Sequence, residues 1–259
     1  MQPYVYIDGK PVAMYIIMGA TGYLVAMLIV LIKRRAFSLR IWDVMQFAAF
    51  AAIGILGGAR VLSVIVKMLQ HGGDPGFWTA KNLIDLLLSA GFVFFGGLLG
   101  GFGMLALLAK LKRIEPKSMF SAYAYVALAF VSFARLGCYC AGCCYGIELA
   151  DGSRFPVQLI EAGFCFAVLL AFLIIRPERR WPNLSLFPIY LITYSVERFI
   201  LEFFRGDVTR GVWLLSTSQW IGLVLIVVAV LWLKKSRLLR KSNEDTPLPE
   251  QEKEAALLH

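Results

Sequence analysis

The charged side chains that interrupt long apolar runs are the residues of this chain best suited to chemistry. Arg198, Glu202 and Arg205 follow one another at i, i+4 and i+7, so on a helix they share one face with Tyr194. Further charges of this kind are Arg60, Arg135, Glu161 and Glu197. Several arginines that converge within a membrane would bind a phosphate group, because guanidinium binds phosphate bidentately. The pattern predicts a site for the head group of a phospholipid.

A plainer interpretation of these charges stays open. Glu202 could pair with both Arg198 and Arg205, and such a ladder of buried ion pairs would then serve helix packing alone. Acid–base catalysis by histidine inside the membrane is not expected, because His71 falls in a predicted loop and His259 ends the chain. The residues alone therefore predict an arginine-rich site that handles phospholipid, without specifying a reaction.

The composition predicts the class of protein that must position these residues. Of the 259 residues 59% are hydrophobic and 17% are charged, with a mean hydropathy of +0.71. A soluble domain usually carries about 25% charged residues. The excess of apolar residues fits several membrane spans of roughly 20 residues each. We therefore expect an all-α, polytopic membrane protein.

Seven spans can be predicted from the apolar runs. They are 12–32, 43–69, 86–109, 118–137, 157–175, 184–204 and 216–233. Clusters of lysine and arginine follow the first, third, fifth and seventh runs, which places the N-terminus outside and the C-terminus in the cytoplasm. The net charge of +9 thus reflects topology, and a nucleic-acid partner is not expected because no single soluble face gathers the charge.

The sequence also predicts how the N-terminal and C-terminal segments are organised. The first eleven residues lack the positive region of a cleavable signal peptide, so the first span is expected to be retained. Residues 1–236 are predicted to form one membrane domain, and 237–259 a disordered cytoplasmic tail.

Four of the five cysteines lie close together. Cys138, Cys140, Cys143 and Cys144 form Cys-x-Cys-x-x-Cys-Cys, and Cys165 lies alone in an apolar run. Four thiolates could hold zinc or an iron–sulfur cluster. A disulfide competes on the outer side of a membrane, and the adjacent pair matches no familiar ligand spacing. Small thiols packed like apolar side chains are the favoured interpretation, so the sequence predicts no metal site and no cofactor.

Several motifs occur in an order that is similar to one known family. They are 15–25 (YIIMGATGYLV), 58–60 (GAR), 95–100 (FGGLLG), 134–137 (ARLG) followed by Gly142 and Gly146, 155–161 (FPVQLIE), 194–205 (YSVERFILEFFR) and Gln219. Together they resemble the prolipoprotein diacylglyceryl transferases over nearly the whole membrane part. The resemblance implies a bacterial inner-membrane enzyme that moves a diacylglyceryl group from phosphatidylglycerol to the lipobox cysteine in the signal peptide of a prolipoprotein.

The resemblance also implies roles for individual residues. Arg135 and Arg198 would bind the phosphate and stabilise charge on the leaving group, and Tyr15 would orient or polarise the lipid. Gly146 would leave space for the substrate. The other substrate-binding residues implied are Arg60, Gly96, Gly97, Gly137, Cys138, Gln158, Glu161, Glu202 and Arg205. The acceptor supplies the thiol, so no cysteine nucleophile is required of the enzyme.

Four positions depart from the family pattern. Phe95 replaces a histidine, Cys138 an asparagine, Cys143 an acid and Ala134 a glycine. The fold should tolerate all four changes. Phe95, Cys138 and Cys143 favour one alternative to the main function, namely a paralogue with the same lipid site and another acceptor. A lipid-binding or transport protein without chemistry is a second alternative.

Overall fold

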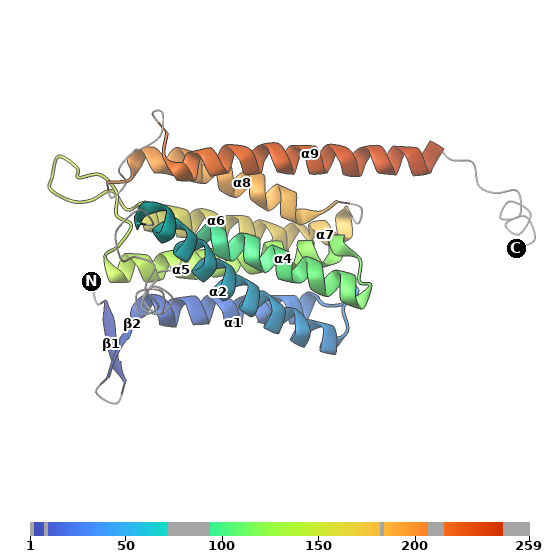
Figure 1. Cartoon of the computed structure of the whole chain (residues 1–259), viewed down its shortest axis with the longest axis horizontal. Coiled ribbons are helices and arrows are strands. Elements are labelled where there is room, and N and C mark those ends of the chain that lie inside the picture. Colours follow the sequence, from blue (N-terminus) through green and yellow to red (C-terminus); the bar gives the residue numbers. More distant parts are fainter. Residues whose placement is uncertain (1–2, 8–9, 72–93, 182–183, 207–214, 246–259) are drawn as a thin grey trace, which may run out of the picture.

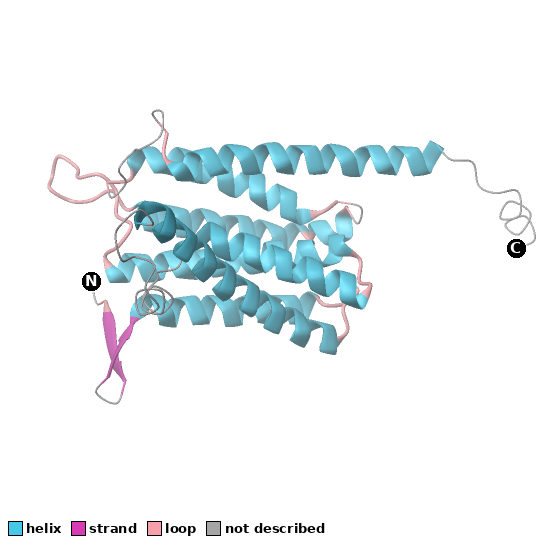
Figure 2. Cartoon of the chain, viewed as in Figure 1, coloured by secondary structure: helices cyan, strands magenta, loops and turns pink. Residues whose placement is uncertain are grey.

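Long helices make up most of the protein in the computed structural model, which describes residues 3–7, 10–71, 94–181, 184–206 and 215–245 (Figure 2). The strands are β1 (Tyr4–Ile7) and β2 (Lys10–Ala13), which pair antiparallel. The helices are α1 (Met14–Lys33), α2 (Ile41–His71), α4 (Phe94–Lys112), α5 (Pro116–Ala141), α6 (Val157–Ile175), α7 (Pro177–Arg180), α8 (Leu186–Leu201), the short 3₁₀ helix η1 (Glu202–Phe204) and α9 (Thr217–Asp245). The prediction of an all-α membrane protein is confirmed, with a small hairpin added before α1.

Six helices of the described ranges are long and apolar enough to cross a membrane: α1, α2, α4, α5, α6 and α9. The predicted span 184–204 corresponds to α8 and η1. Its helix has 16 residues, which is shorter than the roughly 20 that a span needs. A count of seven spans therefore stays a prediction, and the chain is a multi-pass membrane protein.

The predicted boundaries are close to the observed ones, with two differences. The start of the span 86–109 lies outside the described residues, because α4 is described from Phe94 onward. The last helix continues to Asp245, so the predicted start of the tail at 237 falls within α9. The division into a membrane domain and a tail stays a prediction, and 246–259 lie outside the described part.

The basic connections gather at one end of the bundle (Figure 1). The α1–α2, α4–α5 and α6–α7 connections all lie there, while the hairpin, the 142–156 loop and η1 lie at the opposite end. Helix α5 packs against α1, α4, α6 and α8 and is the most deeply buried of the long helices. The C-terminal end of α5 and the N-terminal end of α6 meet at the end opposite the basic connections, which is where the candidate site lies.

Glycines let α2 and α4 approach each other closely. A Cβ atom on Gly96 would overlap the Gly58 carbonyl, and one on Gly97 would lie 3.2 Å from the Ile55 carbonyl oxygen. One on Gly100 would overlap the Gly54 carbonyl oxygen and lie 2.7 Å from the Gly58 Cα. Small residues drive such contacts in lipid, where no hydrophobic force acts between helices. The observed role of Gly96 and Gly97 is thus helix packing, and a role in substrate binding stays a prediction.

Replacing Gly100 with alanine should separate α2 from α4 and lower the stability of the protein. The added methyl has no room against the α2 backbone, and overpacking of this kind costs about 1–3 kcal/mol. Thermal unfolding in detergent measures the effect. Gly103→Ala on the same helix is the control, because a Cβ there would meet nothing within 4 Å. Equal unfolding temperatures for the two variants would contradict the prediction.

Candidate functional site

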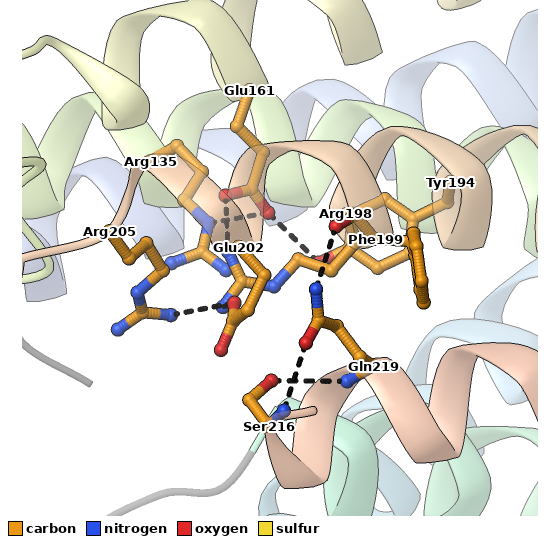
Figure 3. A network of polar contacts seen from close by, with 9 residues as sticks. All are labelled: Arg135, Glu161, Tyr194, Arg198, Phe199, Glu202, Arg205, Ser216 and Gln219. Atoms are coloured by element: carbon orange, nitrogen blue, oxygen red, sulfur yellow. Dashed lines mark hydrogen bonds and ion pairs between the residues drawn. The ribbon is translucent and has the colours of Figure 1, made fainter. Parts of the chain in front are cut away.

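A buried carboxylate on α6 is the centre of a polar network in the bundle (Figure 3). Glu161 lies 2.9 Å from the Arg135 Nε on α5 and 3.3 Å from the Arg198 Nη1 on α8, and it accepts a hydrogen bond of 2.9 Å from the Tyr194 hydroxyl. Its side chain is 1% exposed. A carboxylate this deep needs such partners, because a buried charge without compensation is costly. The network therefore ties three helices together around one acid.

Arg198 joins this acid to a second one. Its Nη2 lies 2.8 Å from Glu202, and the Arg205 Nη1 lies 3.8 Å from the same carboxylate. The prediction that Glu202 pairs with both arginines is confirmed. The ladder and the candidate site are thus one structure, because the arginines that hold the helices together are those proposed to hold a phosphate.

The arginines of the network differ in how many carboxylates they face. Three guanidinium groups, on Arg135, Arg198 and Arg205, face two carboxylates. Arg135 uses its Nε for Glu161, and within the described residues its two terminal nitrogens make no ion pair. The side chains of Arg135 and Arg205 are 13% and 12% exposed, against 6% for Arg198, whose terminal nitrogens both face carboxylates. Arg135 is thus better placed than Arg198 to bind an added anion, and Arg198 fixes the geometry.

Backbone pairing with the 142–156 loop holds Arg205 in place. Gly146 forms an antiparallel bridge with Arg205, and the Ile147 amide donates to the Phe204 carbonyl at 2.9 Å. The rings of Phe155 and Phe204 stack with centroids 5.1 Å apart. The loop between α5 and α6 thereby sets where the chain leaves α8, and with it the position of Arg205.

We expect Gly146→Ala to reduce lipid turnover by displacing this loop. A Cβ there would overlap the Phe155 carbonyl oxygen and lie 2.9 Å from the Phe204 carbonyl oxygen, so the loop and η1 must separate. The cost should be about 1–3 kcal/mol, as for other overpacked sites. Turnover per folded protein measures the effect. Gly163→Ala is a suitable control because nothing lies within 4 Å of its Cβ, and a shared phenotype would refute the steric explanation.

Three thiols come together beside the network. The sulfur atoms of Cys138, Cys143 and Cys144 lie within 4.8 Å of one another. Helix α5 ends at Gly142 in the left-handed region (φ 71°), and the Cys143 amide donates to the Cys138 carbonyl at 3.2 Å. This turn folds the two later cysteines back over the first. All five cysteines of the chain are thiols, and Cys165 is buried in the core as expected.

A cavity lies beside the turn that follows α5. It has a volume of about 330 Å³, and its walls include Tyr139, Tyr145, Arg154, Phe155 and Gln158. Gln158 also donates a hydrogen bond of 2.8 Å to the Cys143 carbonyl. The predicted site residue Gln158 thus links the cavity to the thiol cluster.

Four other predicted site residues lie outside the network of Figure 3. Tyr15 is at the start of α1 and is 50% exposed. Gly137 packs on it, since a Cβ there would lie 2.8 Å from the Tyr15 Cα. Arg60 is half-buried on α2, and Cys138 belongs to the thiol cluster. Tyr15 and Gly137 therefore border the α1–α5 contact, at the same end of α5 as Arg135.

Two features of the site were not predicted from the sequence. Glu161 was expected to line the cavity, yet it is the hub; the signal was that an acid within a span requires a cation nearby. Gln219 joins α9 to α8, because its Nε2 donates to the Phe199 carbonyl at 3.1 Å and its Oε1 accepts from the Ser216 amide at 2.9 Å. No local pattern predicted this contact between distant helices.

Comparisons with known proteins agree with the motifs. A phosphatidylglycerol–prolipoprotein diacylglyceryl transferase of Clostridium tetani is 33% identical over 204 residues, which cover 70% of this chain and 76% of the relative. A second such transferase, numbered 2 in Clostridium perfringens, is 29% identical over 208 residues, or 74% of this chain and 77% of the relative. One from Streptococcus mutans is 26% identical over 253 residues, or 90% and 92%. Residues 3–234 match the family model described as prolipoprotein diacylglyceryl transferase, so the chain belongs to this family.

Proposed function

We propose that this protein is a phosphatidylglycerol–prolipoprotein diacylglyceryl transferase. The acceptor is the thiol of the lipobox cysteine in the signal peptide of a prolipoprotein. Its sulfur bonds to the glyceryl carbon that carries the phosphate ester, and glycerol phosphate leaves. Membership of the family supports this activity. The observation in the molecule that carries it is the cluster of three arginines around two acids, in which the terminal nitrogens of Arg135 make no ion pair within the described residues.

In this mechanism Arg135 binds the phosphate of the lipid directly. Negative charge grows on the phosphate oxygen as its bond to carbon breaks, and a positioned guanidinium stabilises that charge more than it stabilises the bound lipid. Arg198 takes part by holding Arg135 and Arg205 in register through Glu161 and Glu202. Because these ion pairs already fix the positions of the guanidinium groups, the site does not have to rearrange as charge develops in the reaction.

Other residues position the two substrates. Tyr15 borders the lipid at the α1–α5 contact, where Gly137 leaves no bulk between the helices. Gly146 and Gln158 shape the loop beside the cavity, and Arg60 adds positive charge from α2. The basic clusters at the opposite end support an orientation in which the site faces the outer half of the bacterial inner membrane.

Mass spectrometry of a lipobox peptide tests the proposal. Purified protein is reconstituted in bilayers that contain phosphatidylglycerol, and the peptide is examined for a diacylglyceryl group on its cysteine, with glycerol phosphate measured in parallel. The same peptide with serine in place of cysteine, and bilayers of phosphatidylcholine alone, are the controls. Lipid that binds without any modified peptide would disprove this acceptor. Consumption of phosphatidylglycerol with an unmodified peptide would indicate another acceptor.

A further inference from the structure

The proposed reaction needs a group that removes the proton from the acceptor. A free thiol has a pKa of about 8.5, so only a few per cent is thiolate at neutral pH. Histidine is the commonest base for this task, yet none belongs to the polar network around Glu161. His71 and His259 are the chain's only histidines. A buried carboxylate such as Glu197 or a bound metal ion is left for this task.

The thiol cluster has the dimensions of a metal site. Zinc binds thiolates at about 2.3 Å, so two sulfurs on a tetrahedral zinc lie about 3.8 Å apart. The sulfurs of Cys138, Cys143 and Cys144 already lie within 4.8 Å of one another, so small rotations of the side chains would close the site. The turn that brings them together is held by backbone hydrogen bonds rather than by a disulfide. Soft thiolate ligands select zinc over the hard cations of the cell exterior.

The surroundings favour the charge of such a site. Zinc with three thiolates carries one negative charge, which would be costly inside a membrane without a cation nearby. Arg135 lies three residues before Cys138 on α5, so the two side chains share one face of the helix. The guanidinium proposed to bind the lipid phosphate is thus also next to the first of the three thiols. The cluster and the arginine network form one continuous site.

A direct nucleophilic role for these cysteines would not support turnover. A cysteine of the enzyme that attacked the glyceryl carbon would form a thioether, and a thioether sulfur is too poor a leaving group for a second transfer. The cluster is better suited to hold an ion than to attack the lipid.

We propose that Cys138, Cys143 and Cys144 bind one Zn²⁺ ion, and that the acceptor cysteine binds as its fourth ligand and is thereby activated as a thiolate. Catalytic zinc sites typically have three protein ligands and one open position. A thiol that coordinates zinc is deprotonated outright. The inference rests on the proposed function, and it assigns to the ion the task that a basic side chain would otherwise perform. It replaces the expectation of a chain without a metal.

The step balances without an oxidant or a reductant. The acceptor thiol loses its proton to water when its sulfur binds the ion. That sulfur then forms a bond to the glyceryl carbon, and the bond from this carbon to the phosphate oxygen breaks. The electron pair of the broken bond stays on glycerol phosphate, whose charge Arg135 stabilises. The thioether product binds zinc weakly compared with a thiolate, so it can leave.

The cavity beside the turn that follows α5 fits a peptide segment. Tyr139, Tyr145 and Phe155 supply apolar walls, and Gln158 reaches from the wall to the Cys143 carbonyl. The short apolar residues before a lipobox cysteine could occupy this space while the cysteine reaches the ion.

Metal binding is tested first, on the full-length protein. The protein is purified under reducing conditions, treated with a chelator and titrated with Zn²⁺ or Co²⁺. We expect one ion per chain and intense thiolate-to-cobalt absorption bands. Serine variants at Cys138, Cys143 or Cys144 should lose the bands, whereas Cys140→Ser and Cys165→Ala should keep them. Failure of the reduced protein to bind an ion, or bands that survive in the three variants, would overturn the proposal.

Ligation of the acceptor is tested next, in the cobalt protein. A lipobox peptide should shift the visible d–d bands, and the serine peptide should not. Transfer should fall by about 10²–10⁴-fold in metal-free protein, the range that a general base contributes, and should return with zinc. An unchanged spectrum with the peptide, or full transfer without metal, overturns the inference and leaves the proposed function intact. Peptide ligation without any transfer from phosphatidylglycerol instead contradicts the proposed function.

Discussion

Replacing Arg198 with alanine is expected to destabilise the protein and abolish transfer together. The variant leaves Glu202 with the Arg205 contact of 3.8 Å and takes one of three partners from Glu161. Breaking a buried pair by removing one partner typically costs about 3–5 kcal/mol, because a buried charge remains uncompensated. Thermal unfolding in detergent and the peptide modification assay measure the two effects.

A second variant separates the charge effect from the loss of packing. Arg198→Ala combined with Glu202→Gln removes the cation and one of the two acids that it pairs with, so part of the lost stability should return while transfer stays absent. Lys117→Ala is the matched control, because the side chains of its pair with Glu115 are 30% and 62% exposed and such surface changes are usually within about 0.5 kcal/mol. Wild-type unfolding of the Arg198 variant would contradict the role of the network.

Replacing Arg135 with alanine should leave a folded protein that transfers poorly. Glu161 keeps Arg198 and the Tyr194 hydroxyl, so its charge stays compensated. The lost group is the one proposed to stabilise charge on the leaving phosphate, and removing one such donor typically costs about 10²–10³-fold in kcat. Initial rates at saturating and limiting phosphatidylglycerol separate this effect from weaker lipid binding.

Arg135→Lys tests whether the shape of the guanidinium matters. Lysine keeps the charge, but its ammonium lacks the planar set of donors by which a guanidinium can bind Glu161 through Nε and a phosphate through its terminal nitrogens. We expect a rate between those of the wild type and the alanine variant. Equal rates for lysine and arginine would show that charge alone suffices, and a wild-type rate for Arg135→Ala would place the phosphate elsewhere.

Apolar periodicity was sufficient to predict the helices, because the bilayer imposes length and composition on each span. The run 157–175 was predicted with its observed bounds. The predicted elements differ from the observed ones where turns and backbone pairing, rather than hydropathy, determine the local structure. Helix α8 is shorter than its apolar run because the chain turns into η1 and the bridge between Arg205 and Gly146. The hairpin was missed although Asp8-Gly9 is a strong sequence signal for a two-residue turn.

The spacing of residues along one helix predicted part of the site. It could not predict the contacts between helices. The pairing of Glu202 with Arg198 and Arg205 follows from positions on one face. The convergence of Arg135 on Glu161 depends on how α5 packs against α6, which no local pattern determines. The thiol cluster was missed for a related reason. Its ligand spacing is unfamiliar, and the sulfurs meet only because the chain reverses in the left-handed region at Gly142.

The network of Glu161 also bears on how the protein enters the membrane. Helices α5 and α6 can insert as a hairpin whose opposite charges, Arg135 and Glu161, neutralise each other. Helix α8 is short and carries Arg198, whose Nη2 pairs with Glu202 of the same segment, while its Nη1 finds a carboxylate only on α6. It therefore gains its full set of ion pairs only after α6 offers its carboxylate. Biogenesis would proceed in the order of the chain, and loss of Glu161 would stall a late stage of integration, with α8 left at the surface.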